Sequence, residues 1–204
     1  PADARQARYH ARRMAPHITA VHTPRLALRR FTPADLPWIQ RLQADPEVMR
    51  YVGGVHDAAA SEHFLQTRVL DDYTRHPGLG VWATLERSTG ALVGMHLLNH
   101  MFGESHIQVG YVLAAEFWGR GYASEMCGAV LRYGFTTLGL PRIVAITDLD
   151  NHGSQRVLLK CGLRRHGERA FAHPKYASGP YAWFYRDADE WLADADHAST
   201  SPST

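Results

Sequence analysis

The stretch Phe117–Glu125, which reads FWGRGYASE, places two glycines directly before a helix-like pattern. From Ala123 to Leu138, apolar residues recur at the three- and four-residue spacing of an amphipathic helix. An alternating segment, 106–113, precedes the stretch, and a continuous apolar segment, 142–147, follows the helix. These patterns predict a strand, a crossover helix and a second strand parallel to the first, joined by the usual right-handed connection.

Other strand and helix patterns surround this central unit. Segment 25–31, RLALRRF, alternates as a strand does, and Thr32 followed by Pro33 is typical of a helix start. Short turn-like segments, STG and MFGES, separate three strands that read as an antiparallel meander. We predict further strands at 81–86, 92–99, 163–171 and 181–186, and helices at 33–43, 58–73 and 153–161.

Composition restricts the class of protein. The 204 residues are 45% hydrophobic, enough for one globular domain, which we place at 21–193 between a flexible basic tail at 1–20 and a disordered tail at 194–204. The formal charge of +2 is too balanced for a protein whose main partner is nucleic acid or an anionic membrane. No apolar run approaches the roughly 20 residues of a membrane span. With two cysteines and no CxxC pair, we expect a cytoplasmic protein.

The glycines of FWGRGYASE have two interpretations. In one, Gly119 and Gly121 only form a tight turn. In the other, the unpaired amides at the helix start bind an anion, and Arg120 adds a positive charge. The GK[ST] signature of a P-loop is absent. A dinucleotide-binding loop needs a third glycine where Ser124 stands, although Asp148 or Asp150 at the next strand end keeps that alternative open.

Three motifs in order carry a resemblance to a known family. VGYVL, WGRGYASE and NHGSQRVLLKCGL resemble the GNAT acyltransferase superfamily, and specifically its RimJ/RimL-like branch of N-acetyltransferases. The resemblance begins at RLALRRFTPADL and DPEVMRYVGG and extends to the last strands. It implies an α/β fold with a mixed, mostly antiparallel sheet of about seven strands, about four flanking helices and a central β-α-β acetyl-CoA site.

The resemblance also implies which residues hold acetyl-CoA, between the strands at 108–113 and 142–147. The pantetheine arm would bond to main-chain groups of Tyr111, Val112 and Leu113, as an added strand does. Asn151 would bond the same arm, or act as an N-cap, or both. The pyrophosphate loop would comprise Trp118, Gly119, Arg120, Gly121, Tyr122, Ala123 and Ser124.

Two positions depart from the family pattern. Leu158 stands where many members have a tyrosine that donates a proton to the leaving thiolate, so Ser154 becomes our candidate catalytic acid and cofactor contact. Gln108 replaces a glutamate that often precedes the Gly-Tyr pair, and a neutral amide cannot accept a proton. Tryptophan at position 118 is usual in this branch.

The motifs place no general base, and this restricts which amines can serve as the acceptor. At pH 7, removing the proton from an α-amine of pKa about 8 costs roughly 1.4 kcal/mol, against roughly 4.6 kcal/mol for a lysine of pKa about 10.4. An α-amine can manage with a water chain, whereas a stronger base needs a protein group. The candidate bases are Glu104, His106, His100 and His96.

We therefore predict an N-acetyltransferase that transfers the acetyl group of acetyl-CoA directly to a primary amine, without a metal. The amine is a protein N-terminus or a small molecule, selected by the loop near Tyr51, the second helix and the last two strands. Alternatives are a non-catalytic acyl-CoA-binding module and, less favoured, a nicotinamide-dinucleotide oxidoreductase. Cys127 and Cys161 lie at apolar positions and are expected to be inert. A homodimer remains open.

Overall fold

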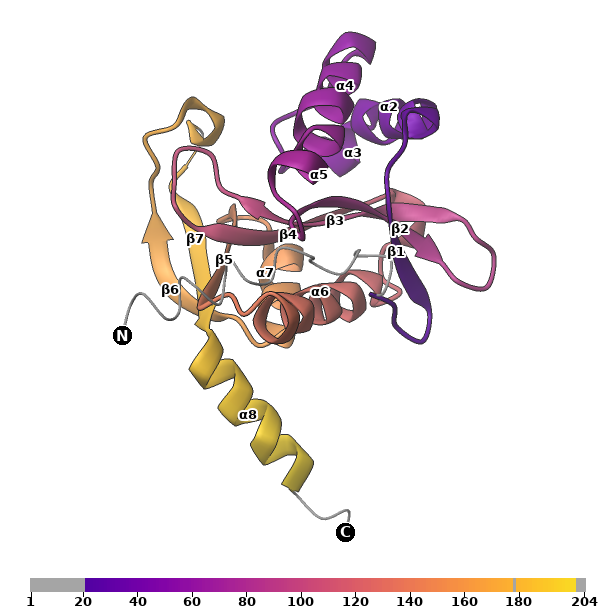
Figure 1. Ribbon diagram of the computed structural model, residues 1–204. Helices are drawn as coiled ribbons and strands as arrows, with labels where there is room; N and C mark the ends of the chain where they lie inside the picture. The colour runs from indigo at the N-terminus through magenta and orange to yellow at the C-terminus, as the bar shows by residue number, and fades with distance from the viewer. Residues whose placement is uncertain (1–20, 178, 201–204) are drawn as a thin grey trace.

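A computed structural model describes residues 21–177 and 179–200, so the predicted N-terminal tail at 1–20 lies outside the described residues. Seven strands form one sheet in the order β1-β2-β3-β4-β5-β7-β6 (Figure 1). The pair β4–β5 is parallel, and the other neighbouring pairs are antiparallel. The strands are β1 Leu26–Arg30, β2 Gly80–Glu86, β3 Leu92–His100, β4 Ile107–Leu113, β5 Arg142–Asp148, β6 Arg164–Arg169 and β7 Tyr181–Asp187.

Helices cover both faces of the sheet. Helices α2 to α5 lie over one face, and α6 and α7 lie against the other (Figure 1). The α-helices are α2 Leu36–Ala44, α3 Pro46–Met49, α4 Ala58–Phe64, α5 Asp72–Arg75, α6 Tyr122–Arg132, α7 His152–Lys160 and α8 Ala188–Thr200. Short 3-10 turns are η2 Pro33–Asp35, η4 Ala115–Phe117 and η6 Pro174–Tyr176, and π-helical turns are η3 Leu65–Leu70 and η5 Tyr133–Thr137.

The predicted fold class is confirmed. Each predicted strand occurs, the crossover helix α6 connects β4 to the parallel strand β5, and the four predicted helical regions are present. The nicotinamide-dinucleotide alternative requires a doubly wound parallel sheet and is therefore wrong for this mostly antiparallel one. The short helix α3 was not predicted.

The C-terminal helix α8 differs from the tail predicted for 194–204. It begins directly after β7 and runs to Thr200, so residues 194–200 are helical. Asp189 and Glu190 lie in its first turn, where carboxylates interact favourably with the helix dipole. Alanines then continue a good helix-forming sequence.

The core lies between the sheet and its two helix layers. Met126, Val130 and Leu131 of α6 are fully buried, as the helical spacing predicts. A second apolar cluster, built around Val144, Tyr176 and Trp183, covers the end of the sheet formed by β5 and β7. The first cluster includes Val109 of β4 and Ile143 of β5, so both clusters contact the central strands.

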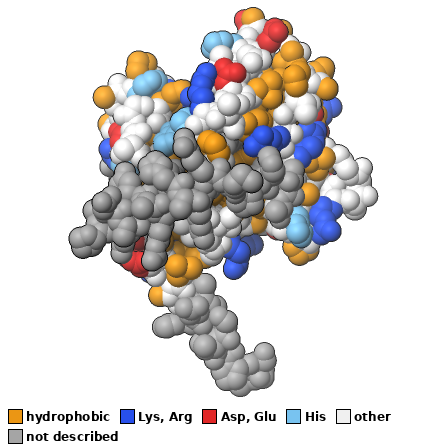
Figure 2. Space-filling model, viewed as in Figure 1, with side chains coloured by type: hydrophobic (Ala, Val, Ile, Leu, Met, Phe, Trp, Pro, Cys, Tyr) orange, Lys and Arg blue, Asp and Glu red, His pale blue; other side chains and the backbone are white. Residues whose placement is uncertain are grey.

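The surface shows no single dominant charge on the face seen in Figure 2. Lys and Arg side chains there are scattered among hydrophobic and acidic ones, in keeping with the formal charge of +2. Among the described residues, no helix combines the length and the apolar character that crossing a membrane would require.

Candidate functional site

The site begins at a gap between β4 and β5. Within the described residues the two strands pair at a single position, Gln108 with Val144, and then diverge. On its other side β4 pairs with β3 along its whole length. Ala114 N–H donates to Val93 O on β3 at 3.0 Å. Since successive residues of a strand alternate in direction, the main-chain groups of Tyr111 and Leu113 face the gap.

This geometry corrects one predicted contact. The same alternation turns the main-chain groups of Val112 toward β3, so Val112 is not available for the main-chain bond expected of it. The carbonyl of Leu113 accepts a hydrogen bond from Nε1 of Trp118 at 2.8 Å. The groups of β4 left for a ligand in the gap are the N–H and C=O of Tyr111 and the N–H of Leu113.

The start of α6 lies next to this gap. Gly119 and Gly121 have φ of +73° and +76°, the left-handed conformation that glycine adopts without strain. Gly121 is the N-cap of α6, and no side chain caps the helix. The first amides of α6 therefore lack an intrahelical acceptor. Among the described residues, a Cβ at Gly119 would meet nothing within 4 Å, so they leave the turn open on that side.

The remaining side chains of the predicted loop have separate partners. Arg120 donates to Glu116 O at 2.9 Å and lies over the ring of Phe117, so its side chain folds back onto the preceding turn. The Tyr122 hydroxyl donates to Glu86 of β2, and this bond is the main cause of the raised pKa of Tyr122. The carbonyl oxygens of Ala123 and Ser124 have polar contacts of their own, which are described below. Trp118 is 43% exposed beside the open turn.

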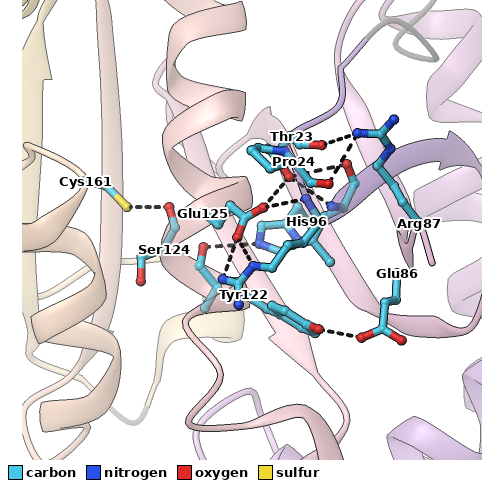
Figure 3. A network of polar contacts seen from close by, with 12 residues as sticks. Thr23, Pro24, Glu86, Arg87, His96, Tyr122, Ser124, Glu125 and Cys161 are labelled. Atoms are coloured by element: carbon cyan, nitrogen blue, oxygen red, sulfur yellow. Dashed lines mark hydrogen bonds and ion pairs between the residues drawn. The ribbon is translucent and has the colours of Figure 1, made fainter. Parts of the chain in front are cut away.

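An ion pair that sequence reasoning missed holds this turn (Figure 3). Glu125, in the first turn of α6, accepts hydrogen bonds from Thr23 Oγ1 at 2.6 Å and Arg25 Nε at 2.6 Å. Burial opposes ionisation, but these hydrogen bonds hold the pKa of Glu125 below its usual value. Arg25 Nη2 lies 3.6 Å from the position of a Cβ at Gly121. The half-exposed Arg25 guanidinium thus adds a cation to the α6 turn.

The start of α7 faces the same gap from β5. Asn151 is the N-cap, and its Oδ1 accepts from Ser154 N–H at 3.0 Å, which confirms the capping role predicted for it. The Tyr111 hydroxyl crosses from β4 and lies 3.1 Å from both the carbonyl and the Oγ of Ser154. Burial raises the pKa of Tyr111, so its hydroxyl stays protonated and donates. Leu158 is buried in the core.

The candidate bases do not converge on the gap. His96 lies beneath α6, with Nδ1 2.7 Å from Thr84 Oγ1 and Nε2 3.4 Å from Ala123 O. Complete burial lowers its pKa to about 4, so it is a neutral core residue. His100 packs on His76, with ring centroids 4.7 Å apart, and burial lowers its pKa. Neither is placed to accept the proton of an amine at the gap.

The other polar candidates are already engaged. Glu104 lies 3.1 Å from Arg169 Nη2 and 3.3 Å from His106 Nδ1. Gln108 Nε2 donates to Asn99 Oδ1 at 3.1 Å.

The burial of the two cysteines limits their reactivity, and the grouping of His, Cys, Asp and Glu side chains decides whether a metal ion could bind. Cys127 is fully buried, and a hydrogen bond with Cys161 together with burial raises its pKa. Cys161 is partly buried and donates to Ser124 O at 3.3 Å. Both positions suit structural thiols. Among the described residues, no three His, Cys, Asp or Glu side chains are grouped as metal ligands.

Comparison with known proteins shows what this site resembles. Residues 25–164 match the family described as the acetyltransferase (GNAT) domain. The chain is 32% identical over 152 residues to the N-acetyltransferase YnaD of Bacillus subtilis, covering 74% of this chain and 84% of YnaD. It is 31% identical over 172 residues to the FsC-acetyl coenzyme A-N(2)-transacetylase of Aspergillus fumigatus, covering 78% and 70%.

Solved structures agree in fold. An acetyltransferase from Agrobacterium tumefaciens superposes with a TM-score of 0.70 at 25% identity, over 81% of this chain and 92% of the other. A spermidine N-acetyltransferase from Vibrio cholerae, solved with CoA and spermine, superposes with a TM-score of 0.66 at 19% identity, over 83% and 99%. At that identity, the second likeness shows the fold alone.

Proposed function

The chain belongs to the GNAT acetyltransferase family, and we propose that it transfers an acetyl group from acetyl-CoA directly to a primary amine. GNAT acetyltransferases use acetyl-CoA, and the relatives above carry the names of N-acetyltransferases. The amine is the N-terminus of a protein or that of a small molecule. The observation that carries the proposal is the gap after Gln108 and Val144, which opens beside the uncapped start of α6.

The residues around the gap fit the donor. An extended pantetheine arm needs unpaired main-chain groups on a strand edge, and Tyr111 and Leu113 present them. A pyrophosphate needs unpaired amides and space, and the turn at Gly119–Gly121 offers both. Arg25, half exposed beside Gly121, adds a cation to this turn. These features support a donor site shared by β4 and α6.

Each group of the chain then has a role in the transfer. The bound thioester supplies an activated acetyl group. The N–H groups that β4 directs into the gap donate to the thioester carbonyl as it gains negative charge. The Ser154 hydroxyl, held by Tyr111, donates to the departing thiolate. The amine gives up its proton to water and attacks the thioester carbon directly, and CoA leaves as the thiol; Cys127 is buried and Cys161 is bonded to Ser124 O, so neither carries the acetyl group.

The test is a panel of amines incubated with acetyl-CoA and the protein, with free thiol measured. The panel holds peptides with free α-amines, free amino acids, spermidine and an aminoglycoside. We expect thiol release that requires both protein and amine, and an acetylated amine in the mass spectrum. Tight binding of acetyl-CoA with no thiol released by any member would instead support the non-catalytic acyl-CoA-binding module.

A further inference from the structure

The face of the gap opposite α6 carries the side chains that an acceptor meets. Side chains alternate along β4, so Gln108 and Gly110 face away from α6, whereas Tyr111 faces α7 and α6. On that opposite face, η3 lies on one side and the β6–β7 connection with η6 lies on the other (Figure 1). With the donor on the α6 side, an acceptor amine would approach from this opposite face, which η3 and the β6–β7 connection border.

Two cations project from these segments. Arg68 of η3 lies over the ring of Phe102, with Cζ 3.9 Å from the ring centroid. Phe102 N–H donates to the Tyr176 hydroxyl of η6 at 3.1 Å, so Arg68 and η6 share this aromatic contact. Lys175 of η6 donates from Nζ to Val52 O at 3.4 Å. The two cations thus lie at the contact between η3, η6 and the segment after α3.

These cations have no counterion among the described residues. No carboxylate forms an ion pair with Arg68 or Lys175 there. Partial burial and the charge of Arg68 lower the pKa of Lys175, as expected for two like charges held close together. Glu104, the acid of this region, is shared by Arg169 and His106. Lys175 keeps much of its surface exposed, and an anion between the two cations would reduce their mutual repulsion.

His56 adds an unsatisfied polar atom beside Lys175. Its Nδ1 is buried and has no hydrogen-bond partner within the described part of the chain. Burial and the charge of Lys175 lower the pKa of His56, so the ring is neutral near pH 7. A neutral imidazole can donate to an anion from one ring nitrogen.

We propose that Arg68 and Lys175 bind a carboxylate carried by the acceptor amine. This inference rests on the proposed function and specifies its substrate class: an amine whose molecule also bears a carboxylate, as in an amino acid or an acidic peptide. A polyamine, such as the spermine bound in the Vibrio cholerae structure, would instead bring further positive charge to two unpaired cations. The site therefore selects against polyamines.

Kinetic measurements on the intact chain test this selectivity. The acceptors are phenylalanine, phenylalanine amide and spermidine, followed by a short acidic peptide and its neutral counterpart. We expect kcat/KM for phenylalanine to exceed that for the amide at least tenfold, because charge-assisted hydrogen bonds to a carboxylate are roughly twice as strong as neutral ones. Preference for the amino acid or for the acidic peptide identifies the source of the carboxylate.

Single substitutions test whether Arg68 and Lys175 cause the preference for a carboxylate. Arg68→Gln and Lys175→Gln should each remove most of the carboxylate preference, because they lower kcat/KM for phenylalanine much more than kcat/KM for the amide. Arg165→Gln is the matched control. Arg165 is on the edge strand β6, 3.5 Å from Glu168, so the variant removes the same charge far from the gap. It should leave kcat/KM unchanged for both acceptors. Equal turnover of both acceptors by the wild type, or equal losses on both acceptors in the variants, would overturn the inference.

A binding measurement separates this inference from the proposed function. N-acetylphenylalanine and its amide are titrated calorimetrically into the protein with CoA present. We expect at least tenfold tighter binding of the carboxylate, lost in Arg68→Gln. That result without thiol release in the amine panel would support the anion site and contradict acetyl transfer. Acetyl transfer with no difference between the two ligands would support the function and overturn the anion site.

Discussion

At the scale of single residues, two glycines determine how the chain approaches α6. Gly119 and Gly121 adopt positive φ, and Gly121 leaves the first amides of the helix uncapped. Taken by itself, the GxG pattern favours a tight turn over an anion site. The structure adds open space at Gly119 and the Arg25 guanidinium beside Gly121.

The first prediction concerns a negative charge introduced at position 121. Gly121→Asp places a carboxylate among the amides proposed to bind the pyrophosphate, so we expect CoA to bind at least tenfold more weakly, measured by calorimetric titration. Gly121→Asn is the matched control, since Asn has nearly the same shape and tolerates positive φ equally well. Equal affinities in the two variants would show that charge at this turn does not matter for the donor.

The second prediction concerns the two hydroxyls at the start of α7. Tyr111→Phe removes the bonds to both the carbonyl and Oγ of Ser154, so we expect the unfolding free energy to fall by about 1 kcal/mol in chemical denaturation. Ser154→Ala keeps the bond from Tyr111 to the carbonyl and should cost less stability. It should still lower kcat about 10- to 100-fold if Oγ donates to the thiolate. An unchanged kcat in Ser154→Ala would remove Ser154 from the mechanism.

At the scale of elements, Glu125 links α6 to the segment before β1. Arg25 and Thr23 stabilise the charged carboxylate, so Glu125 has a lower pKa in the folded protein than in the unfolded chain. Its stabilising contribution is therefore complete above the unfolded pKa of about 4.3 and is lost as the pH falls through the folded value.

The third prediction follows from the lowered pKa of Glu125 in the folded protein. The difference in unfolding free energy between wild type and Glu125→Gln should be constant above about pH 5 and shrink below about pH 4.3. Urea denaturation at a series of pH values measures it. Arg165→Gln, which leaves Glu125 untouched, serves as the control. A difference that grows on acidification would contradict the ion-pair assignment.

The fourth prediction concerns the contact of β3 with β4 at the gap. A Cβ at Gly94 would lie 2.8 Å from Leu113 Cα and would also meet Val112 O, so β4 would have to shift. We expect Gly94→Ala to lower the unfolding free energy by about 1–3 kcal/mol and to weaken CoA binding. Gly128→Ala, on α6 with open space around it, should instead raise stability by about 0.5–1 kcal/mol. A neutral Gly94→Ala would show that β3 and β4 tolerate a wider separation.

Local pattern predicted the elements well because their signals are local. The spacing of Met126, Val130 and Leu131 defines the buried face of α6 without any knowledge of its neighbours. Long-range contacts have no such signal. Arg25 and Glu125 are 100 residues apart, and only the folded sheet brings β1 next to α6. The commitment of Val112 to β3 likewise depends on strand register, which alternation alone does not determine.

At the scale of the whole molecule, the sheet is continuous except where β4 and β5 diverge. Helix layers cover both faces (Figure 1), and the turn before α6 and the start of α7 contact β4 through Trp118 and Ser154. Sequence motifs predicted the α6 and α7 sides of this site. The opposite side, with Arg68 and Lys175, carries no motif, because its residues come from segments that meet only in the fold.

The central claim is that acetyl-CoA binds in the gap between β4 and β5, and residue-resolved amide exchange tests it most directly. Within the strands that the structure describes, the amides of Tyr111 and Leu113 have no partner, whereas that of Val112 belongs to the β3–β4 ladder. Saturating CoA should slow exchange at Tyr111, Leu113 and the first amides of α6, and leave Val112 nearly unchanged. Uniform exchange with and without CoA, or protection confined to another surface, would contradict the account.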